Sequence, residues 1–205
     1  MTLLDAKKAA RAAAVRRRDA AHAALAATAP QRVAANFAAA FPLADAAVVS
    51  GYWPGRSELD IRPLMTALHH CHHALCLPVV VGRGRPLVFR RWQPGDALEA
   101  KPFGLSEPFA EAGELVPDVL LVPFLAFDRE GYRIGYGAGY YDMTLAALRA
   151  RGTVLAVGVG YAAQAVERLP RAAHDERLDG VVTEESAMHF PRGSVGLGGK
   201  TGRVS

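Results

Sequence analysis

The chain has 205 residues, 51% of them hydrophobic and 21% charged, a composition that fits one globular domain and excludes a mostly disordered protein. Its apolar runs, such as 119–122, are too short to span a membrane, and no apolar stretch follows the early basic residues, so we expect neither a membrane segment nor a secretory signal. The formal net charge of +4 is modest, but six basic residues lie between Lys7 and Arg18, a patch that faces water or an anionic partner.

The first predicted element is a long helix over residues 4–27, which are rich in Ala and contain neither Gly nor Pro. Lys7, Arg11 and Arg18 are spaced by four and seven residues along it. This spacing stacks their side chains on one face of the helix.

Strands and helices then alternate along the chain. Six apolar runs have the length of buried strands, at 46–52, 77–81, 86–92, 118–122, 154–159 and 180–183. Three further helices are expected at 31–41, 57–75 and 141–150, the second of them opened by a capping box at 57–60 with Pro63 in its first turn. This alternation predicts a three-layer α/β/α fold with a mostly parallel, Rossmann-like sheet. A glycine-containing hairpin at 82–85 makes that sheet mixed.

The domain organisation follows from what lies between and after these elements. Residues 93–117, with four prolines and three glycines, are expected to be mostly loop. No internal repeat or linker interrupts residues 1–190, so we predict one α/β domain there. Residues 191–205 are Gly-rich and basic and are expected to form a flexible tail.

The chemistry is concentrated in residues 123–142, where a buried strand leads into alternating glycines and then directly into a helix. Such a turn offers free backbone N–H groups and the positive end of a helix dipole to a phosphate. Arg133 adds a planar cation suited to phosphate oxygens. Asp142 supplies a hard oxygen ligand for Mg²⁺. Alternating glycines alone also occur in flexible surface turns, so it is the whole unit of strand, glycines, Arg133 and Asp142 that indicates a phosphate site.

The same run resembles the signature of the 5-formyltetrahydrofolate cyclo-ligase family, also called the methenyltetrahydrofolate synthetases. That signature is P-G-L-A-F-D, two residues, G, one residue, R-L-G, one residue, G, one residue, G-Y-Y-D. This chain departs from it at Phe124, where the pattern has glycine and the backbone path is therefore in question, and at Ile134. Weaker matches follow the family's order at Lys7, Arg11, Glu58, 106–108, Gln164, Pro170, 174–175, Asp179 and 183–184.

The resemblance implies an ATP-dependent ligase of one-carbon metabolism. Such an enzyme cyclises 5-formyltetrahydrofolate to 5,10-methenyltetrahydrofolate, with release of ADP and phosphate, by phosphorylating the formyl oxygen. It implies Mg²⁺ with ATP as co-substrate, a cytoplasmic monomer, and neither nucleic acid nor membrane as partner. The only two cysteines, Cys71 and Cys76, form a poor disulfide framework and also favour a reducing compartment.

The resemblance also assigns roles to individual residues. Arg133 and Arg11 would be catalytic residues. Asp142 and Asp175 would hold Mg²⁺. The residues expected to bind ATP are Lys7, Lys8, Arg11, Arg133, Gly135, Tyr136, Gly137, Ala138, Gly139, Tyr140 and Tyr141. Those expected to bind folate are Trp53, Glu58, Tyr136 and Tyr140. Structural alternatives stay open, since Lys7 and Arg11 are also typical solvated helix charges, Trp53 a typical core residue, and both aspartates typical caps.

Three other hypotheses remain. Residues 69–73 are rich in histidine, and on a helix His69, His73 and Cys76 share a face that suits a metal. The basic N-terminal helix is also compatible with non-specific nucleic-acid binding, although few aromatic residues accompany it. Another small-molecule kinase on an α/β scaffold is the nearest enzymatic alternative.

Overall fold

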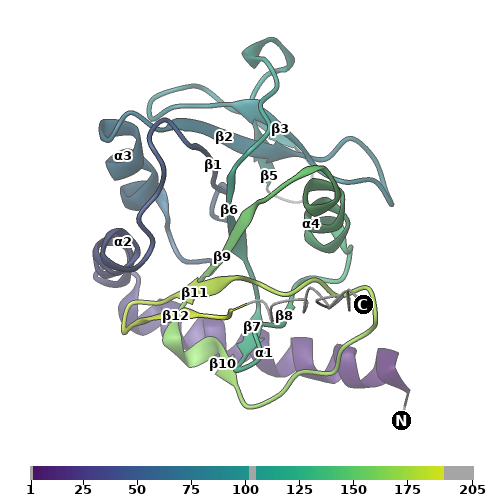
Figure 1. The fold of residues 1–205 in the computed structure, drawn as a ribbon. Coiled ribbons are helices and arrows are strands. Elements are labelled where there is room, and N and C mark those ends of the chain that lie inside the picture. Colours follow the sequence, from purple (N-terminus) through teal and green to yellow (C-terminus); the bar gives the residue numbers. More distant parts are fainter. Residues whose placement is uncertain (1, 102–104, 192–205) are drawn as a thin grey trace, which may run out of the picture.

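The computed structural model describes residues 2–101 and 105–191, which form a central sheet with helices around it (Figure 1). The sheet has seven strands in the order β12-β11-β9-β6-β1-β2-β3. Their bounds are Val48–Ser50 (β1), Ala74–Val79 (β2), Val88–Arg91 (β3), Val119–Pro123 (β6), Leu155–Val159 (β9), Gly180–Val182 (β11) and Ala187–His189 (β12). Strands β1, β2, β6, β9 and β11 are parallel, whereas β3 and β12 pair antiparallel at the two edges. The predicted mixed, mostly parallel sheet is confirmed.

Helices cover both faces of this sheet (Figure 1). Helices α2 (Ala29–Ala40) and α3 (Arg62–His70) lie on one face, and α4 (Tyr140–Arg151) lies on the other. Helix α1 (Leu3–Leu25) crosses the end of the sheet toward which β6 and β9 run. The arrangement is the three-layer α/β/α fold that the sequence predicts.

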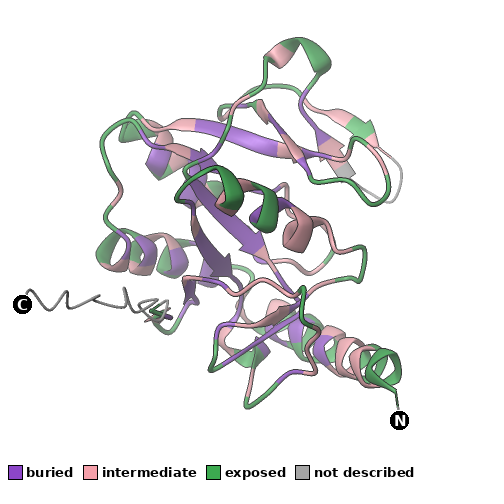
Figure 2. Cartoon of the chain, turned by 45° about the vertical axis from the view of Figure 1, so that its right-hand side comes forward, coloured by how far each residue is buried: buried purple, intermediate pink, exposed green. Residues whose placement is uncertain are grey.

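The pleat of β6 shows how the sequence separates the two sides of the core. Val119 and Leu121 belong to the apolar cluster under α2 and α3, whereas Leu120 and Val122 belong to the cluster under α4. Successive side chains of a strand point to opposite faces, so an uninterrupted apolar run serves both clusters. The central strands are accordingly the most buried part of the chain (Figure 2). Each large apolar side chain buried here stabilises the fold by about 1.5–3 kcal/mol.

Short strands and turns extend the fold beyond the main sheet. Strands β7 (Ala126–Asp128), β8 (Arg133–Ile134) and β10 (Ala165–Val166) form a small sheet in the order β10-β7-β8. A separate pair, β4 (Glu99–Lys101) and β5 (Leu105–Glu107), lies within the stretch predicted to be mostly loop. Two 3₁₀ helices are η2 (Ala110–Ala112) and η3 (Ala162–Gln164).

Two expectations about the third helix are wrong. It begins only at Arg62, where the Asp60 carboxylate accepts a hydrogen bond from the Arg62 N–H at 2.9 Å, and Ser57 does not cap it. It ends at His70 instead of continuing to residue 75, because His72 adopts a left-handed backbone (φ 65°) that turns the chain into β2. The expected Pro63 in the first turn is confirmed.

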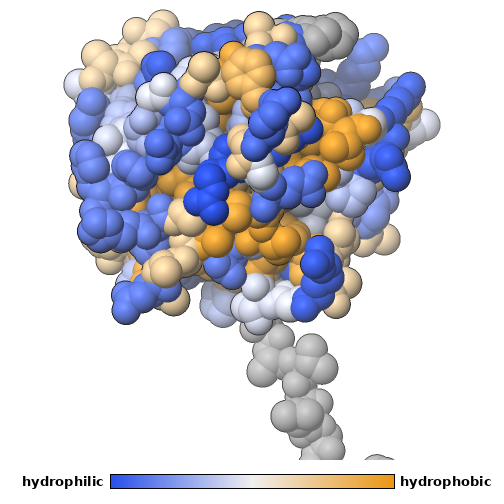
Figure 3. Space-filling model, turned by 90° about the horizontal axis from the view of Figure 1, so that it is seen from above, coloured by the Kyte–Doolittle hydropathy of each residue, from blue (hydrophilic) through white to orange (hydrophobic). Residues whose placement is uncertain are grey.

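The remaining features concern the surface and the C-terminal end. Strand β12 was not expected from the sequence, and residues 192–205 of the predicted tail lie outside the described residues. Among the described helices none has the length and hydropathy of a membrane span. On the end opposite α1, the described residues show several small hydrophobic patches separated by hydrophilic side chains (Figure 3).

Candidate functional site

The predicted site lies where the parallel strands end. Strand β6 continues into the β7–β8 hairpin and the glycine-rich loop 135–139, which leads into α4. Helix α1 packs beside β8 and η3, and side chains from its basic face contact the loop. Ligands of open α/β sheets bind at the carboxyl ends of the strands, where this loop lies.

The glycine-rich loop has a backbone that favours glycine. Gly137 (φ +107°) and Gly139 (φ +73°) lie in the left-handed region. Gly139 is the N-cap of α4 and has no side chain to bind the first N–H groups of the helix. A Cβ added to Gly135 or Gly139 meets no described atom within 4 Å, so the space beside them is open. These are the features that an anion-binding loop requires.

Arg11 lies against this loop. Its Nε donates a hydrogen bond to the Gly135 carbonyl at 3.0 Å. A Cβ on Gly137 would be 3.1 Å from the guanidinium carbon, so any larger residue there has to displace Arg11. The structure therefore brings together two of the elements predicted to bind ATP.

Lys7, one turn earlier, ties α1 to a different segment. Its Nζ donates hydrogen bonds to both oxygens of Asp175, at 2.8 and 2.6 Å. The Ala172 N–H donates to Oδ2 of the same carboxylate at 2.7 Å. Burial acts to raise the pKa of Asp175, but the hydrogen bonds from Lys7 and Ala172 outweigh it and lower this pKa. Lys8 is exposed.

Arg133 is buried next to Asp142. Its side chain is 5% exposed, and it donates hydrogen bonds to Asp142 Oδ1 at 3.1 Å and to the Glu176 carbonyl at 2.7 Å. Burial lowers the pKa of Arg133, and the Asp142 carboxylate opposes this effect. These contacts make Arg133 a support for Asp142, while direct contact of Arg133 with ATP stays a prediction.

The two aspartates predicted to hold Mg²⁺ lie on adjoining segments. The Glu176 N–H, directly after Asp175, donates to Asp142 Oδ1 at 3.0 Å. Asp142 Oδ2 has no hydrogen bond within residues 2–101 and 105–191. Carboxylate oxygens suit Mg²⁺, and one or two suffice where phosphates and waters supply the other ligands. Although the described residues contain no group of three or more metal-binding side chains, the pair of carboxylates fits an ion shared with a phosphate.

A second charged cluster joins α1 to the segment after β1. Arg18 is 2% exposed. It donates hydrogen bonds to the Tyr136 hydroxyl at 2.6 Å and to Ser57 Oγ at 3.1 Å, and its Nη1 lies 3.9 Å from the Glu58 carboxylate. We refer to Arg18, Ser57, Glu58 and Tyr136 as the Arg18 cluster. The sequence placed Arg18 on the face of Lys7 and Arg11 but gave it no role, although its spacing of seven residues from Arg11 pointed to this site.

Burial and hydrogen bonding compete at Glu58. Burial raises the pKa of the Glu58 carboxyl, while the Gly55 N–H, the Arg18 charge and the Tyr136 hydroxyl act in the opposite direction. The Gly55 N–H donates to Glu58 Oε2 at 2.9 Å. The structure thus brings together two residues predicted to bind folate, Glu58 and Tyr136.

The other predicted substrate-binding aromatic residues are partly buried. Trp53 packs edge-on against Trp92, with ring centroids 6.0 Å apart. In the part of the chain that is described, no observed contact joins Trp53 to the Arg18 cluster, so its stacking on substrate stays a prediction. Tyr140, also predicted to bind folate, and Tyr141, predicted to bind ATP only, pack against the apolar cluster under α4. Burial, with the nearby Glu58 charge, raises the pKa of Tyr141.

Phe124, where the signature has glycine, belongs to the core. Its side chain is 3% exposed and lies 5.1 Å from the Phe127 ring, centroid to centroid. A Cβ on Gly158 or Gly160 would come within 2.7 and 2.6 Å of the Phe124 ring. Because these two glycines have no side chains, there is room for the Phe124 ring, which packs in the apolar core under α4.

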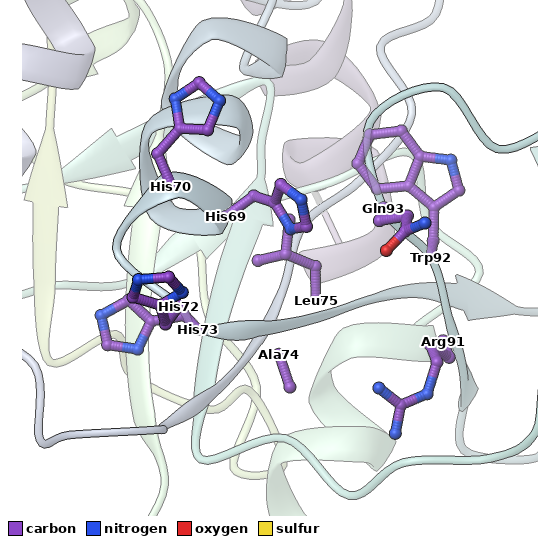
Figure 4. A pocket seen from close by; sticks show the side chains of 9 residues that line it. All are labelled: His69, His70, His72, His73, Ala74, Leu75, Arg91, Trp92 and Gln93. Carbon is purple, nitrogen blue, oxygen red and sulfur yellow. The ribbon is translucent and has the colours of Figure 1, made fainter.

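A cavity of about 490 Å³ lies near the amino end of β2, at the end of the strand opposite to the glycine-rich loop (Figure 4). Its lining residues are His69, His70, His72, His73, Ala74, Leu75, Arg91, Trp92 and Gln93. The shared helix face proposed for His69, His73 and Cys76 is wrong, because the helix ends at His70 and Cys76 is buried within β2. The described side chains form no group of three that suits a metal.

Comparisons with known proteins agree with this geometry. Residues 4–184 match the model of the 5-formyltetrahydrofolate cyclo-ligase family. The 5-formyltetrahydrofolate cyclo-ligase of Escherichia coli K12 is 32% identical over 155 residues, which cover 73% of this chain and 84% of that protein. The corresponding protein of Mycolicibacterium smegmatis is 35% identical over 150 residues, covering 68% of this chain and 75% of its own.

Two solved structures share the fold. The NMR structure of 5,10-methenyltetrahydrofolate synthetase from Aquifex aeolicus superposes with a TM-score of 0.69 at 31% identity, over 94% of this chain and 95% of that one. The synthetase from Mycoplasma pneumoniae gives a TM-score of 0.69 at 20% identity, over 87% and 99% of the two chains, and supports the fold alone.

Proposed function

This chain belongs to the 5-formyltetrahydrofolate cyclo-ligase family, and we propose that it converts 5-formyltetrahydrofolate and ATP to 5,10-methenyltetrahydrofolate, ADP and phosphate. The observation that carries the proposal is the glycine-rich loop, open on one side, with Arg11 against it and Asp142 just after it. The family match does not favour the alternatives of another small-molecule kinase or a nucleic-acid-binding protein.

The reaction has to turn an amide oxygen into a leaving group. The formyl oxygen attacks the γ-phosphorus of ATP, the bond to ADP breaks, and the formyl carbon becomes an imidoyl-type phosphate. The second folate nitrogen then attacks that carbon, closes the ring with loss of its proton, and phosphate departs. The protein takes no covalent part in these steps, so its contribution is positioning and charge stabilisation.

The ATP phosphates are assigned to the glycine-rich loop and its basic neighbours. The N–H groups at the start of α4 and the Arg11 guanidinium face the same loop, which supports binding of the terminal phosphates there. Lys7, Lys8 and Arg133 complete the proposed set, together with Tyr136, Ala138, Tyr140 and Tyr141. Arg133 contributes by holding Asp142, and Arg11 is the cation that can reach the transferred group.

Asp142 and Asp175 are the residues that would hold Mg²⁺. When bound there, the ion supplies positive charge that neutralises the phosphate oxygens during transfer. Besides its proposed contact with ATP, Lys7 orients the Asp175 carboxylate, because its ammonium group is paired with that carboxylate.

Folate is assigned to the Arg18 cluster and the aromatic residues near it. The Glu58 carboxylate suits the ring N–H donors of a pterin. Tyr136 is 54% exposed, so its ring is available for contact. Trp53 and Tyr140 complete the proposed folate site as aromatic walls.

A cytoplasmic monomer with a single domain over residues 1–190 is the state in which we expect this activity. The free thiols Cys71 and Cys76 support a reducing compartment. On the face shown in Figure 3, hydrophilic side chains separate the hydrophobic patches, as expected for a surface that faces water. Analytical ultracentrifugation of the purified protein tests the oligomeric state, and a stable dimer contradicts it.

The test of function is an absorbance assay for the methenyl product. Purified protein is mixed with 5-formyltetrahydrofolate and Mg·ATP, and product is expected only when ATP is present. Arg11→Met should lower kcat/KM by about ten- to a hundredfold, because it removes a charged hydrogen-bond donor from the loop. Arg17→Met, an exposed arginine on the same helix, is the matched control and should behave as wild type. Absence of ATP-dependent product from folded protein contradicts the proposal.

A further inference from the structure

Arg18 is a buried cation in the cluster assigned to folate, but the proposed mechanism gives its guanidinium group no task of its own. It ends a run of three arginines, of which Arg16 and Arg17 are exposed while Arg18 is only 2% exposed. Burial of a guanidinium costs free energy unless the charge is paired and hydrogen-bonded. The partners of Arg18 therefore indicate its role.

Those partners come from two segments that the sequence keeps far apart. Tyr136 belongs to the glycine-rich loop, and Ser57 and Glu58 belong to the segment after β1. Ser57 also donates a hydrogen bond to Asp19, the next residue of α1, which fixes that segment against the helix. One guanidinium thus connects the loop assigned to ATP with the carboxylate assigned to folate.

Arg18 is the hydrogen-bond donor to both Tyr136 and Ser57 in this cluster. The Tyr136 hydroxyl accepts a hydrogen bond from Arg18 at 2.6 Å, and both Arg18 and Tyr136 act to lower the pKa of the Glu58 carboxyl. A hydroxyl that accepts from a cation is polarised and becomes a stronger donor. Arg18 therefore acts on Glu58 by its charge at 3.9 Å, and its hydrogen bond also fixes the Tyr136 hydroxyl in the same cluster.

The surroundings of Glu58 make this support necessary. Burial raises the pKa of Glu58, and Gly55, Arg18, Tyr136 and Arg56 oppose it. The other titratable groups that face it are Tyr52 and Tyr141, whose own pKa values rise because of burial and the Glu58 charge. Without Arg18, burial has a larger net effect, and protonated Glu58 is populated at higher pH. A protonated carboxyl is a poorer acceptor for ring N–H donors.

We propose that Arg18 is a positioning residue of the folate site, which orients Glu58 and Tyr136 and keeps Glu58 available as a charged acceptor for the substrate's N–H groups. This inference rests on the proposed function, because it requires that Glu58 face 5-formyltetrahydrofolate. We expect the effect to fall mainly on folate, since Arg18 contacts the loop assigned to ATP through the Tyr136 side chain and not through the loop backbone.

The experiment compares Arg18→Met with the matched control Arg17→Met. For each variant, kcat and both KM values are measured across the acid side of the pH profile. In Arg18→Met the KM for 5-formyltetrahydrofolate should rise about tenfold or more, whereas the KM for ATP stays within about twofold of wild type. The acid limb of kcat/KM for folate should move to higher pH. Arg18→Lys should return that limb toward wild type because it restores the charge, and Arg17→Met should leave every value unchanged.

Four outcomes contradict the inference or its premise. Equal changes in both KM values, or an unmoved acid limb in folded Arg18→Met, overturn the positioning role while wild-type activity leaves the proposed function standing. If circular dichroism shows that Arg18→Met does not fold, Tyr136→Phe decides, because it removes the hydroxyl that accepts the Arg18 hydrogen bond from a residue that is 54% exposed. An unmoved limb in Tyr136→Phe then overturns the role. Wild-type protein without methenyl product refutes the proposed function and this inference with it.

Discussion

Gly137 combines a left-handed backbone with a close side-chain neighbour. We predict that Gly137→Ala raises the KM for ATP about tenfold, because the new methyl group displaces the Arg11 guanidinium, which is 3.1 Å from the Cβ position. The positive φ should also cost about 1–2 kcal/mol of unfolding free energy. Steady-state kinetics and urea unfolding measure the two effects.

Gly84→Ala is the control that separates these effects. Gly84 also has a positive φ (+71°), but a Cβ there meets no described atom within 4 Å. It should lose similar stability and keep the wild-type KM. If both variants change KM equally, steric displacement of Arg11 is not the cause.

Asp142 offers a second prediction for a single residue. Asp142→Asn keeps an oxygen for the Glu176 N–H but loses the charge that attracts Mg²⁺. The Mg²⁺ concentration for half-maximal activity should therefore rise by about tenfold or more at fixed ATP. Asp45→Asn, an exposed aspartate remote from these contacts, serves as control. An unchanged Mg²⁺ response of Asp142→Asn argues against its role as a metal ligand.

At the scale of single residues, the sequence predicts best the features that depend on the backbone. The alternating glycines predicted an open loop before α4, and the structure has it. The burial of Arg18 and Arg133 was not predicted. An arginine is buried only when remote segments supply acceptors, and those contacts are set by the tertiary fold. The helical phase shared with Lys7 and Arg11 was the one local indication for Arg18.

Among the elements, α1 is attached to the segment 172–176 through the Lys7–Asp175 ion pair. Because the pKa of Asp175 is lowered on folding from its ordinary value of 3.8, the pair stabilises the protein above that pH, and the contribution is lost as pH falls through the folded-state pKa. Wild type should therefore lose more unfolding free energy than Asp175→Asn on acidification below about pH 4.

Urea unfolding in Mg²⁺-free buffer between neutral and strongly acid pH measures this difference. Asp45→Asn should follow the wild-type curve, since it tests loss of an exposed carboxylate. Parallel curves for wild type and Asp175→Asn would show that the ion pair does not contribute to stability.

The boundaries of elements were predictable where propensity and packing agree. The Ala-rich α1 and the apolar β6 lie close to their expected positions. The end of α3 was wrong, because His72 turns the chain with a left-handed backbone that no Gly or Pro announces. Strand β12 was missed because a three-residue edge strand is defined by its antiparallel partner β11, not by its own composition.

At the scale of the molecule, the alternation of strands and helices predicted the three layers but not the order of the strands. That order depends on which crossover packs where, and the sequence contains no local signal for it. The glycine-rich segment predicted to bind phosphate follows β6 at the carboxyl ends of the parallel strands, where ligands of such sheets bind, and its role there stays a prediction.

The family match ends at residue 184, whereas the described structure continues through β12. We predict that a chain ending at Pro191 keeps kcat and both KM values within about twofold of wild type. A chain ending at Glu185 should be less stable, because it lacks β12 and Phe190, which is 8% exposed and packs at Gly131. Thermal unfolding and kinetics of both chains test this, and loss of activity in the longer one contradicts it.

The contacts of α1 have a consequence for how the molecule assembles. This helix is synthesised before the rest of the fold. However, the partner of Arg11 is the Gly135 carbonyl, 124 residues later in the chain, and the partner of Lys7 is the Asp175 carboxylate, 168 residues later. A nascent chain therefore carries an unpaired basic helix until nearly the whole sheet has been synthesised. The contacts that complete the proposed ATP site therefore form late in synthesis, and a chain that ends before Asp175 lacks the carboxylate that pairs with Lys7.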